Sequence, residues 1–234
     1  MIQTTTAHFD TETASHAGMT GKQNEDRFTV SHFWVGSKKH RPSVLAVLCD
    51  GIGGHKAGEV AAEIGVRTIT ESVAEGDPQN PIKTLEEAVN CANQAVYQAS
   101  QSTRGRFGMG TTCACAWVID GRLYTVNLGD SRIYLLREGH IIQLTTDHTW
   151  IQEALDAGLL TDADRSDHPN AHVIRRYLGS EKSPEPDFRL WFFEADGDED
   201  ALANQGLQLQ PDDILLLCSD GLTDLVADEE IQEV

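Results

Sequence analysis

Residues 111–128 of this 234-residue chain read TTCACAWVIDGRLYTVNL. Two stretches, 111–119 and 122–128, are rich in β-branched and aromatic residues and lie on either side of the pair Asp120-Gly121. An Asp-Gly pair in this position is a strong signal for a two-residue hairpin turn, because both residues tolerate positive φ. The segment therefore predicts two antiparallel strands joined by a tight turn.

The strand pattern continues beyond this hairpin. Residues 132–137 form a third candidate strand, and Glu138-Gly139 begins a return through residues 140–144. Strands joined by such short turns are antiparallel neighbours. The middle of the chain therefore predicts an antiparallel meander.

Helical periods lie on both sides of the meander. Apolar residues recur at helical spacing in residues 58–74 and, more clearly, in residues 85–99. After the meander we expect a helix from about Thr149, a short helix at residues 173–178 and a strand at residues 188–193. Helices and strands come in blocks rather than in alternation, which predicts an α+β fold and argues against a doubly wound parallel sheet.

Four acidic tripeptides are spread over nearly the whole chain. Two of them end apolar runs, 44–48 and 214–217, which predict buried strands that deliver a carboxylate at their ends. Carboxylates gathered in this way repel one another unless a cation lies between them, so the pattern indicates a hard-metal site with oxygen ligands. The four are Asn24-Glu25-Asp26, Cys49-Asp50-Gly51, Gly129-Asp130-Ser131 and Ser219-Asp220-Gly221.

The charge of the chain limits its possible partners. It carries 37 acidic and 18 basic residues, a formal net charge of −19. Nucleic acid and anionic membranes both require a basic face, so the charge argues against both as partners. An acidic surface is typical of a soluble protein, and it is also compatible with an anionic substrate if bound cations reverse the field locally. The charge alone does not choose between these interpretations.

The length of the chain fits one domain with a substantial core. No apolar run approaches the roughly 18 residues of a membrane span, and the first residues lack the basic and apolar regions of a signal peptide. We therefore expect a cytoplasmic protein. The five cysteines are odd in number and lie mostly in apolar runs, which favours core residues in a reducing compartment over disulfides or zinc ligands.

Several motifs, taken in order, resemble one known family. Residues 50–59 read Asp-Gly-Ile-Gly-Gly-His-Lys-Ala-Gly-Glu and are similar to the Asp-Gly-x-Gly-Gly-His-x-x-Gly-Glu signature of the metal-dependent protein serine/threonine phosphatases (PPM, type 2C). The other matching segments are Asn24-Glu25-Asp26 and residues 108–112, 128–134, 144–149 and 218–224. Ordered motifs over residues 16–234 are far more specific than a single Asp-Gly pair.

The resemblance implies a bacterial-type member with a four-layer αββα sandwich, in which helices flank two central antiparallel sheets. It implies a single catalytic domain that hydrolyses phosphoserine and phosphothreonine in proteins. The hydrolysis would use two or three Mn²⁺ or Mg²⁺ ions, and a metal-bridging hydroxide would attack the phosphate group. Phosphorylated proteins would be the substrates, and a serine/threonine kinase is a further expected partner.

The resemblance also implies the metal ligands. Asp50 would bridge two ions, the Gly51 carbonyl would help to hold the first, and Asp220 would hold the second. Asp130 would hold a third ion. Taken alone, however, Gly-Asp-Ser is more typical of a turn between strands.

Other site residues are expected around these ligands. Glu25 and Asp26 would act mainly through metal-bound waters, while His55 is either a hydrogen-bonded loop histidine or a catalytic acid or orienting donor near the phosphate. Family members usually carry a phosphate-binding arginine where this chain has Gly21. Lys22, the next residue, could supply a point charge there without the bidentate geometry of arginine.

The end of the chain is a second departure from the family pattern. That pattern continues beyond the Asp220 motif through a helix and a strand with a further metal-binding carboxylate, so we expect a domain that lacks its C-terminal helix and strand segment. Two alternatives therefore stay open. One is a degenerate phosphatase fold that binds or regulates partners, and the other is a hydrolase of small phosphate esters.

Overall fold

The computed structural model describes the whole chain except residues 20, 22, 37–40, 53–56, 162–167 and 234. Its strands are β1 (Ile2–Thr4), β2 (Arg27–Val35), β3 (Arg41–Cys49), β4 (Gly51–Ile52), β5 (Gly110–Thr111), β6 (Cys113–Ile119), β7 (Arg122–Leu128), β8 (Arg132–Arg137), β9 (His140–Gln143), β10 (Leu207–Gln208) and β11 (Ile214–Cys218). Its helices are α1 (Gly58–Glu75), α2 (Pro81–Ser102), α3 (Trp150–Asp156), α4 (Asp198–Ala203), α5 (Asp220–Thr223) and α6 (Asp228–Gln232).

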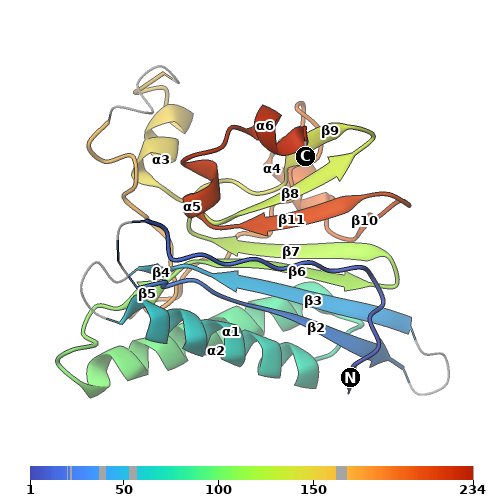
Figure 1. Cartoon of the computed structure of the whole chain (residues 1–234), viewed down its shortest axis with the longest axis horizontal. Coiled ribbons are helices and arrows are strands. Elements are labelled where there is room, and N and C mark those ends of the chain that lie inside the picture. Colours follow the sequence, from blue (N-terminus) through green and yellow to red (C-terminus); the bar gives the residue numbers. More distant parts are fainter. Residues whose placement is uncertain (20, 22, 37–40, 53–56, 162–167, 234) are drawn as a thin grey trace.

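Two sheets form the centre of the fold (Figure 1). The large sheet has the strand order β1-β2-β3-β6-β7-β10, the small sheet has the order β11-β8-β9, and β4 pairs with β5. All of these strand pairs are antiparallel. With the helices, this arrangement confirms the predicted α+β fold with two central antiparallel sheets.

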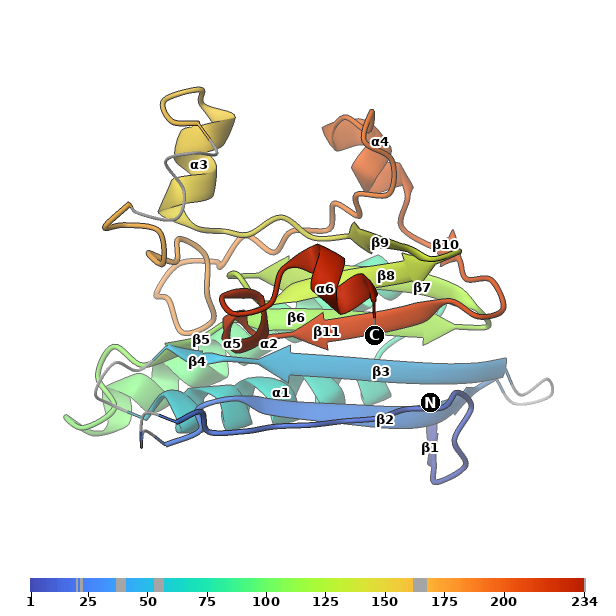
Figure 2. The same cartoon turned by 45° about the horizontal axis from the view of Figure 1, so that its top comes forward.

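The large sheet is covered on both faces. The helices α1 and α2 lie against one face (Figure 2), where their apolar side chains share a core with Leu45 and Trp117. The small sheet lies against the other face, where Ile133 and Leu135 of β8 join Ala116 of β6 in a second core. Because β6 is covered on both sides, all of its residues are buried.

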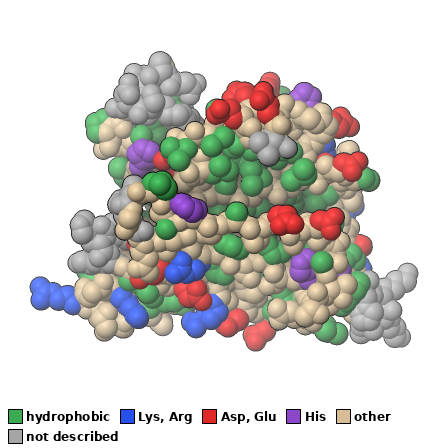
Figure 3. All heavy atoms as spheres, viewed as in Figure 1, with side chains coloured by type: hydrophobic (Ala, Val, Ile, Leu, Met, Phe, Trp, Pro, Cys, Tyr) green, Lys and Arg blue, Asp and Glu red, His purple; other side chains and the backbone are tan. Residues whose placement is uncertain are grey.

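The outer face of the small sheet is apolar as well. Tyr134 and Leu136 of β8 point away from the second core, and they pair with Leu216 and Ile214 of β11. Ile214 is exposed, and Figure 3 shows apolar side chains over this part of the molecule. In the described part of the chain, the short helices α5 and α6 lie next to β11 and β9. The fourth, helical layer therefore stays a prediction.

Both expected hairpin turns are present. Asp120 and Gly121 have φ of 53° and 76°, and Glu138 and Gly139 have φ of 52° and 76°. Two consecutive positive φ values are those of a type I′ turn, whose twist matches that of the flanking strands. The turn residues thus fix the β6-β7 and β8-β9 pairings that the sequence predicts.

Two elements expected after the meander are absent from the described structure. The predicted helix at residues 173–178 is wrong, because this segment makes isolated β-bridges instead of helical turns. The predicted strand at residues 188–193 is also wrong. Its backbone N–H groups bond to scattered partners, Leu190 to a carbonyl of α4 and Trp191 to the Leu144 carbonyl, so no ladder forms.

We expect Asn93 of α2 to be important for stability. Its side chain donates to the carbonyls of Ser180 and Lys182 (3.0 and 3.2 Å) and accepts from the N–H groups of Gly179 and Ser180 (2.8 and 3.0 Å). Asn93→Ala removes all four of these partly buried hydrogen bonds and should lower the free energy of unfolding by about 2–3 kcal/mol in urea denaturation. Gln94→Ala, at the exposed next position, is the control, and an equal effect of the two would contradict this role.

Candidate metal centre

The strand registers bring all four acidic motifs to one end of the molecule. Because β2 and β3 are antiparallel, with Arg27 opposite Cys49, the start of β2 lies beside the end of β3. Asp26 therefore neighbours Asp50. In the small sheet, Arg132 at the start of β8 lies opposite Cys218 at the end of β11, which brings the two later motifs together.

The Gly129-Asp130-Ser131 motif marks the place where the chain leaves the large sheet. The preceding strand β7 belongs to the large sheet and the following strand β8 to the small sheet. Gly129 has φ of 100°, and a Cβ there would come within 2.6 Å of the Thr112 side chain. A residue with a side chain would be strained in this conformation. Asp130 follows directly and is buried, with 8% of its surface exposed.

Hydroxyl groups connect the acidic motifs across the two sheets. The Asp50 N–H donates to Thr112 Oγ1 (2.9 Å), and this oxygen is 2.7 Å from Ser131 Oγ. On the other side of the site, Ser219 Oγ donates to Asp26 Oδ2 (2.9 Å). Sequence reasoning gave these three hydroxyls no role, although Ser131 and Ser219 belong to two of the acidic motifs.

Two glycines bring the start of α1 close to the end of β3. A Cβ on Gly51 would lie 2.3 Å from the Gly58 carbonyl carbon, and a Cβ on Gly58 would lie 2.7 Å from both the Gly51 oxygen and Glu25 Oε1. The Gly51 carbonyl and the Glu25 carboxylate therefore lie close together. A side chain at position 51 or 58 would leave no room for this arrangement. Both are oxygen donors of the kind that a hard cation prefers.

The carboxylates of this end are destabilised as anions. Burial, followed by repulsion from Asp26 and Asp220, raises the pKa of Asp50. Burial and then the charge of Asp224 raise the pKa of Asp220. Burial, followed by repulsion from Asp220 and Asp147, raises the pKa of Asp130 to about 7. The negative charge of its neighbours therefore disfavours the ionised form of each of these carboxyl groups, and the low dielectric of the buried site strengthens this repulsion.

This electrostatic arrangement fits divalent cations. Within the ranges that the structure describes, no group of three or more His, Cys, Asp or Glu side chains is placed to hold one metal ion by itself. Mg²⁺ and Mn²⁺ are compatible with such an arrangement, because they take oxygen ligands and Mg²⁺ usually keeps several waters. Asp50, Asp220, Asp130 and the Gly51 carbonyl are the oxygen donors that could hold the ions here.

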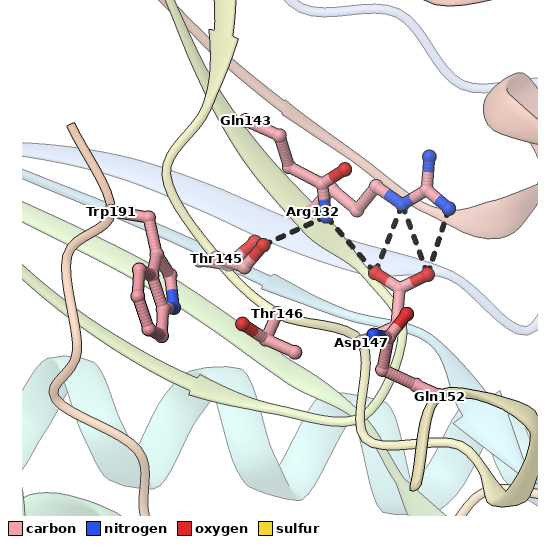
Figure 4. A pocket seen from close by; sticks show the side chains of 7 residues that line it. All are labelled: Arg132, Gln143, Thr145, Thr146, Asp147, Gln152 and Trp191. Atoms are coloured by element: carbon pink, nitrogen blue, oxygen red, sulfur yellow. Dashed lines mark hydrogen bonds and ion pairs between the residues drawn. The ribbon is translucent and has the colours of Figure 1, made fainter. Parts of the chain in front are cut away.

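Arg132 lies beside these carboxylates, but it is already paired. Its guanidinium donates to both oxygens of Asp147, at 2.7 Å from Nη2 to Oδ2, and also to the Tyr134 hydroxyl. Figure 4 shows this ion pair at one side of a pocket of about 470 Å³, with the Trp191 ring at the other side. Arg132 is therefore held by protein groups rather than directed at a phosphate. Lys22 and His55, which were expected near the phosphate, lie outside the described residues.

Comparison with known proteins agrees with the fold. The family model described as protein phosphatase 2C matches residues 14–233. Serine/threonine phosphatase stp of Listeria monocytogenes is 33% identical over 202 residues, which cover 85% of this chain and 73% of that protein. The S. agalactiae serine/threonine phosphatase structure superposes with a TM-score of 0.76 at 26% identity, covering 92% of this chain and 81% of that one. The PstP catalytic domain in complex with 2 manganese ions superposes with a TM-score of 0.64 at 31% identity, covering 89% and 83%.

The chain therefore belongs to the protein phosphatase 2C family. This confirms three predictions from the sequence: the family, a phosphatase that acts on phosphorylated protein, and a requirement for Mn²⁺ or Mg²⁺. The comparisons do not assign the individual site residues, which stay predictions. None of the described helices is long and apolar enough to cross a bilayer.

The raised pKa values predict how the stability of the metal-free protein depends on pH. Asp130 has an ordinary pKa of 3.8 and a pKa of about 7 in the folded chain. Between these values the folded state holds a proton that the unfolded chain has released. The free energy of unfolding therefore falls as the pH rises from about 4 to about 7. We expect the melting temperature in EDTA to fall over this interval.

Saturating Mn²⁺ should raise the melting temperature more at about pH 7.5 than at about pH 5, because protons and cations compete for the same carboxylates. Asp130→Asn should flatten part of the pH dependence in EDTA, since the amide has no proton to release. Differential scanning calorimetry at several pH values measures both effects. A melting temperature that rises with pH in EDTA would mean that these groups are ionised without a metal.

Proposed function

We propose that this chain hydrolyses phosphoserine and phosphothreonine side chains of proteins at the joint end of its two sheets. The observation that carries the proposal is the convergence of Asp50, Asp130 and Asp220 from the ends of β3, β7 and β11. Such clustered carboxylates are stable as anions only beside cations. A phosphate monoester needs the same cations, because its own negative charge repels an attacking hydroxide.

In this proposal each carboxylate has a separate role. Asp50 would help to hold both of two divalent ions, while Asp220 and the Gly51 carbonyl would each help to hold one of them. When bound, the ions supply Lewis acidity and lower the pKa of a shared water. Asp130 would hold a third ion, and Glu25 and Asp26 would orient bound waters. The Thr112 and Ser219 hydroxyls hold the Asp50 backbone and the Asp26 carboxylate in position.

Phosphate binding is the least typical part of the proposed site. The position of the usual arginine is Gly21, and Arg132 is engaged by Asp147. We assign the remaining positive charge to Lys22, with His55 as an acid or orienting donor for the leaving oxygen. A lysine offers a point charge rather than a planar pair of donors, so substrate binding should be weak.

Further features of the function rest on the sequence. A serine/threonine kinase partner, a cytoplasmic location and a single catalytic domain over residues 1–234 are proposals. So is the argument from the net charge of −19 that neither nucleic acid nor a membrane is a partner.

Asp50→Asn tests the central role. The change keeps the shape of the side chain and removes the charge, so the fold should persist while Mn²⁺-dependent release of phosphate from a phosphothreonine peptide falls at least about a hundredfold, or ~2.7 kcal/mol of barrier. Asp10→Asn, at an exposed position, is the control. Activity within about tenfold of wild type in a folded Asp50→Asn variant would exclude the bridging role.

The same assay with a small aryl phosphate separates the alternative functions. A protein phosphatase should turn over both compounds and favour the peptide. Turnover of the aryl phosphate alone would indicate a small-ester hydrolase, and turnover of neither would indicate a binding module.

Gly21→Arg tests phosphate recognition. Gly21 has φ of 73°, and a Cβ there would meet no atom within 4 Å, so the arginine has space but adopts a strained backbone. We expect a lower KM for the phosphopeptide together with a loss of about 1 kcal/mol in the free energy of unfolding. Steady-state kinetics and urea denaturation measure the two effects. An unchanged KM would mean that Lys22 or another group already fills the role.

A further inference from the structure

His148 is buried beside the proposed metal centre and holds the residue before Asp130. The Gly129 N–H donates to His148 Nδ1 (3.1 Å), and the His148 backbone N–H donates to the Gly129 carbonyl (2.9 Å). One residue therefore binds both backbone polar groups of Gly129. The histidine has 5% of its surface exposed, so water does not compete for these bonds.

A second buried residue fixes the orientation of the imidazole. Since Nδ1 accepts from an N–H group, the ring proton belongs on Nε2, which lies 3.1 Å from Asp187 Oδ2. The Arg189 guanidinium donates to the same carboxylate, at 2.6 Å from Nη2 to Oδ2. Burial alone would raise the pKa of Asp187, but the hydrogen bonds from His148 and Arg189 lower it, so the acceptor is an anion. A series of hydrogen bonds therefore runs from Arg189 through Asp187 and His148 to Gly129, and every acceptor in it has a donor.

The hydrogen bonds with His148 act on Gly129, whose backbone torsions are little restricted because it has no side chain. Gly129 has φ of 100°, a region that glycine enters easily and leaves as easily. The direction of the next side chain, that of Asp130, depends on this torsion. A bond to each polar group of Gly129 removes the freedom without filling the space that Thr112 occupies.

We propose that His148, oriented by Asp187, is a positioning residue that aims the Asp130 carboxylate at a divalent cation. The inference rests on the proposed role of Asp130 as a metal ligand. His148 itself touches neither metal nor substrate. Residues that orient metal ligands in this way typically affect metal affinity by about 10- to 100-fold.

A double-mutant cycle on Mn²⁺ binding tests the proposal. We expect His148→Leu to weaken the binding of one Mn²⁺ ion about tenfold in isothermal titration calorimetry, and His148→Asn to lose less, because its Oδ1 can still accept from the Gly129 N–H. In an Asp130→Ala background, His148→Leu should leave the affinity of the remaining ions unchanged. His140→Leu, at an exposed position of β9, is the control.

The outcomes separate the inference from the function on which it rests. If Asp130→Ala leaves the number and affinity of bound Mn²⁺ ions unchanged, Asp130 is not a ligand and both proposals fail at this residue. If Asp130→Ala removes one ion but His148→Leu weakens Mn²⁺ binding equally in both backgrounds, or not at all, His148 has only a structural role and the inference is overturned.

The wild-type protein gives an independent measurement in case His148→Leu does not fold. The ¹⁵N NMR signals of the His148 ring should show a proton on Nε2 and a bare Nδ1 near neutral pH. A proton on Nδ1 would break the bond from Gly129 and exclude the proposed geometry.

Discussion

Repulsion among buried carboxylates is the constraint on which this end of the molecule depends. Asp50, Asp130 and Asp220 are delivered by three different strands, and burial together with their mutual charge raises the pKa of each. A fold that gathers these groups has to oppose their tendency to separate. It does so with neutral donors, namely Thr112, Ser219 and the backbone, which hold the loops without cancelling the charge that attracts cations.

The same constraint explains how an acidic protein can bind an anionic ester. The net charge of −19 repels a phosphate group at long range. Two arginines close to the site do not relieve this repulsion: Arg132 is bound to Asp147, and Arg27 donates to the Asn24 and Asp26 carbonyls. Positive charge at the reaction centre must come chiefly from the metal ions. If these carboxylates hold the ions as proposed, the acidic character of the site is a requirement for activity.

Local sequence signals account for much of this structure. Type I′ turns require two residues that tolerate positive φ, so Asp120-Gly121 and Glu138-Gly139 predict their hairpins from short-range preferences alone. The segment at residues 188–193 shows the limit. Leu190 and Phe192 pack into the second core, but the backbone partners of the segment lie in α4 and in the loop after β9. Burial pattern alone cannot distinguish a strand from such an extended segment.

The site itself was predictable only in part, for a related reason. The acidic motifs are visible because each ends or begins a strand, but the division of the meander between two sheets at Gly129 follows from packing that no local pattern encodes. The partners of His148 were equally hidden. Asp187 lies 39 residues away and reaches it through an extended segment without regular structure. Sequence reasoning assigned roles to the charged residues of the site, and it missed the residues that hold these charged residues in position.

Because the proposed ligands come from both sheets, metal binding and sheet packing depend on each other. Near the ligands, side-chain hydrogen bonds between Thr112 and Ser131 and between Ser219 and Asp26 connect the large sheet to the small one. An ion held by Asp50 and Asp220 would add a link between the sheets. A ligand that binds only the folded state stabilises it by about 2.7 kcal/mol at a hundredfold excess over its dissociation constant. That is more than a hydrogen bond between two hydroxyls supplies, and similar to one that a carboxylate accepts. The metal ions would therefore help to hold together the part of the fold that positions their own ligands.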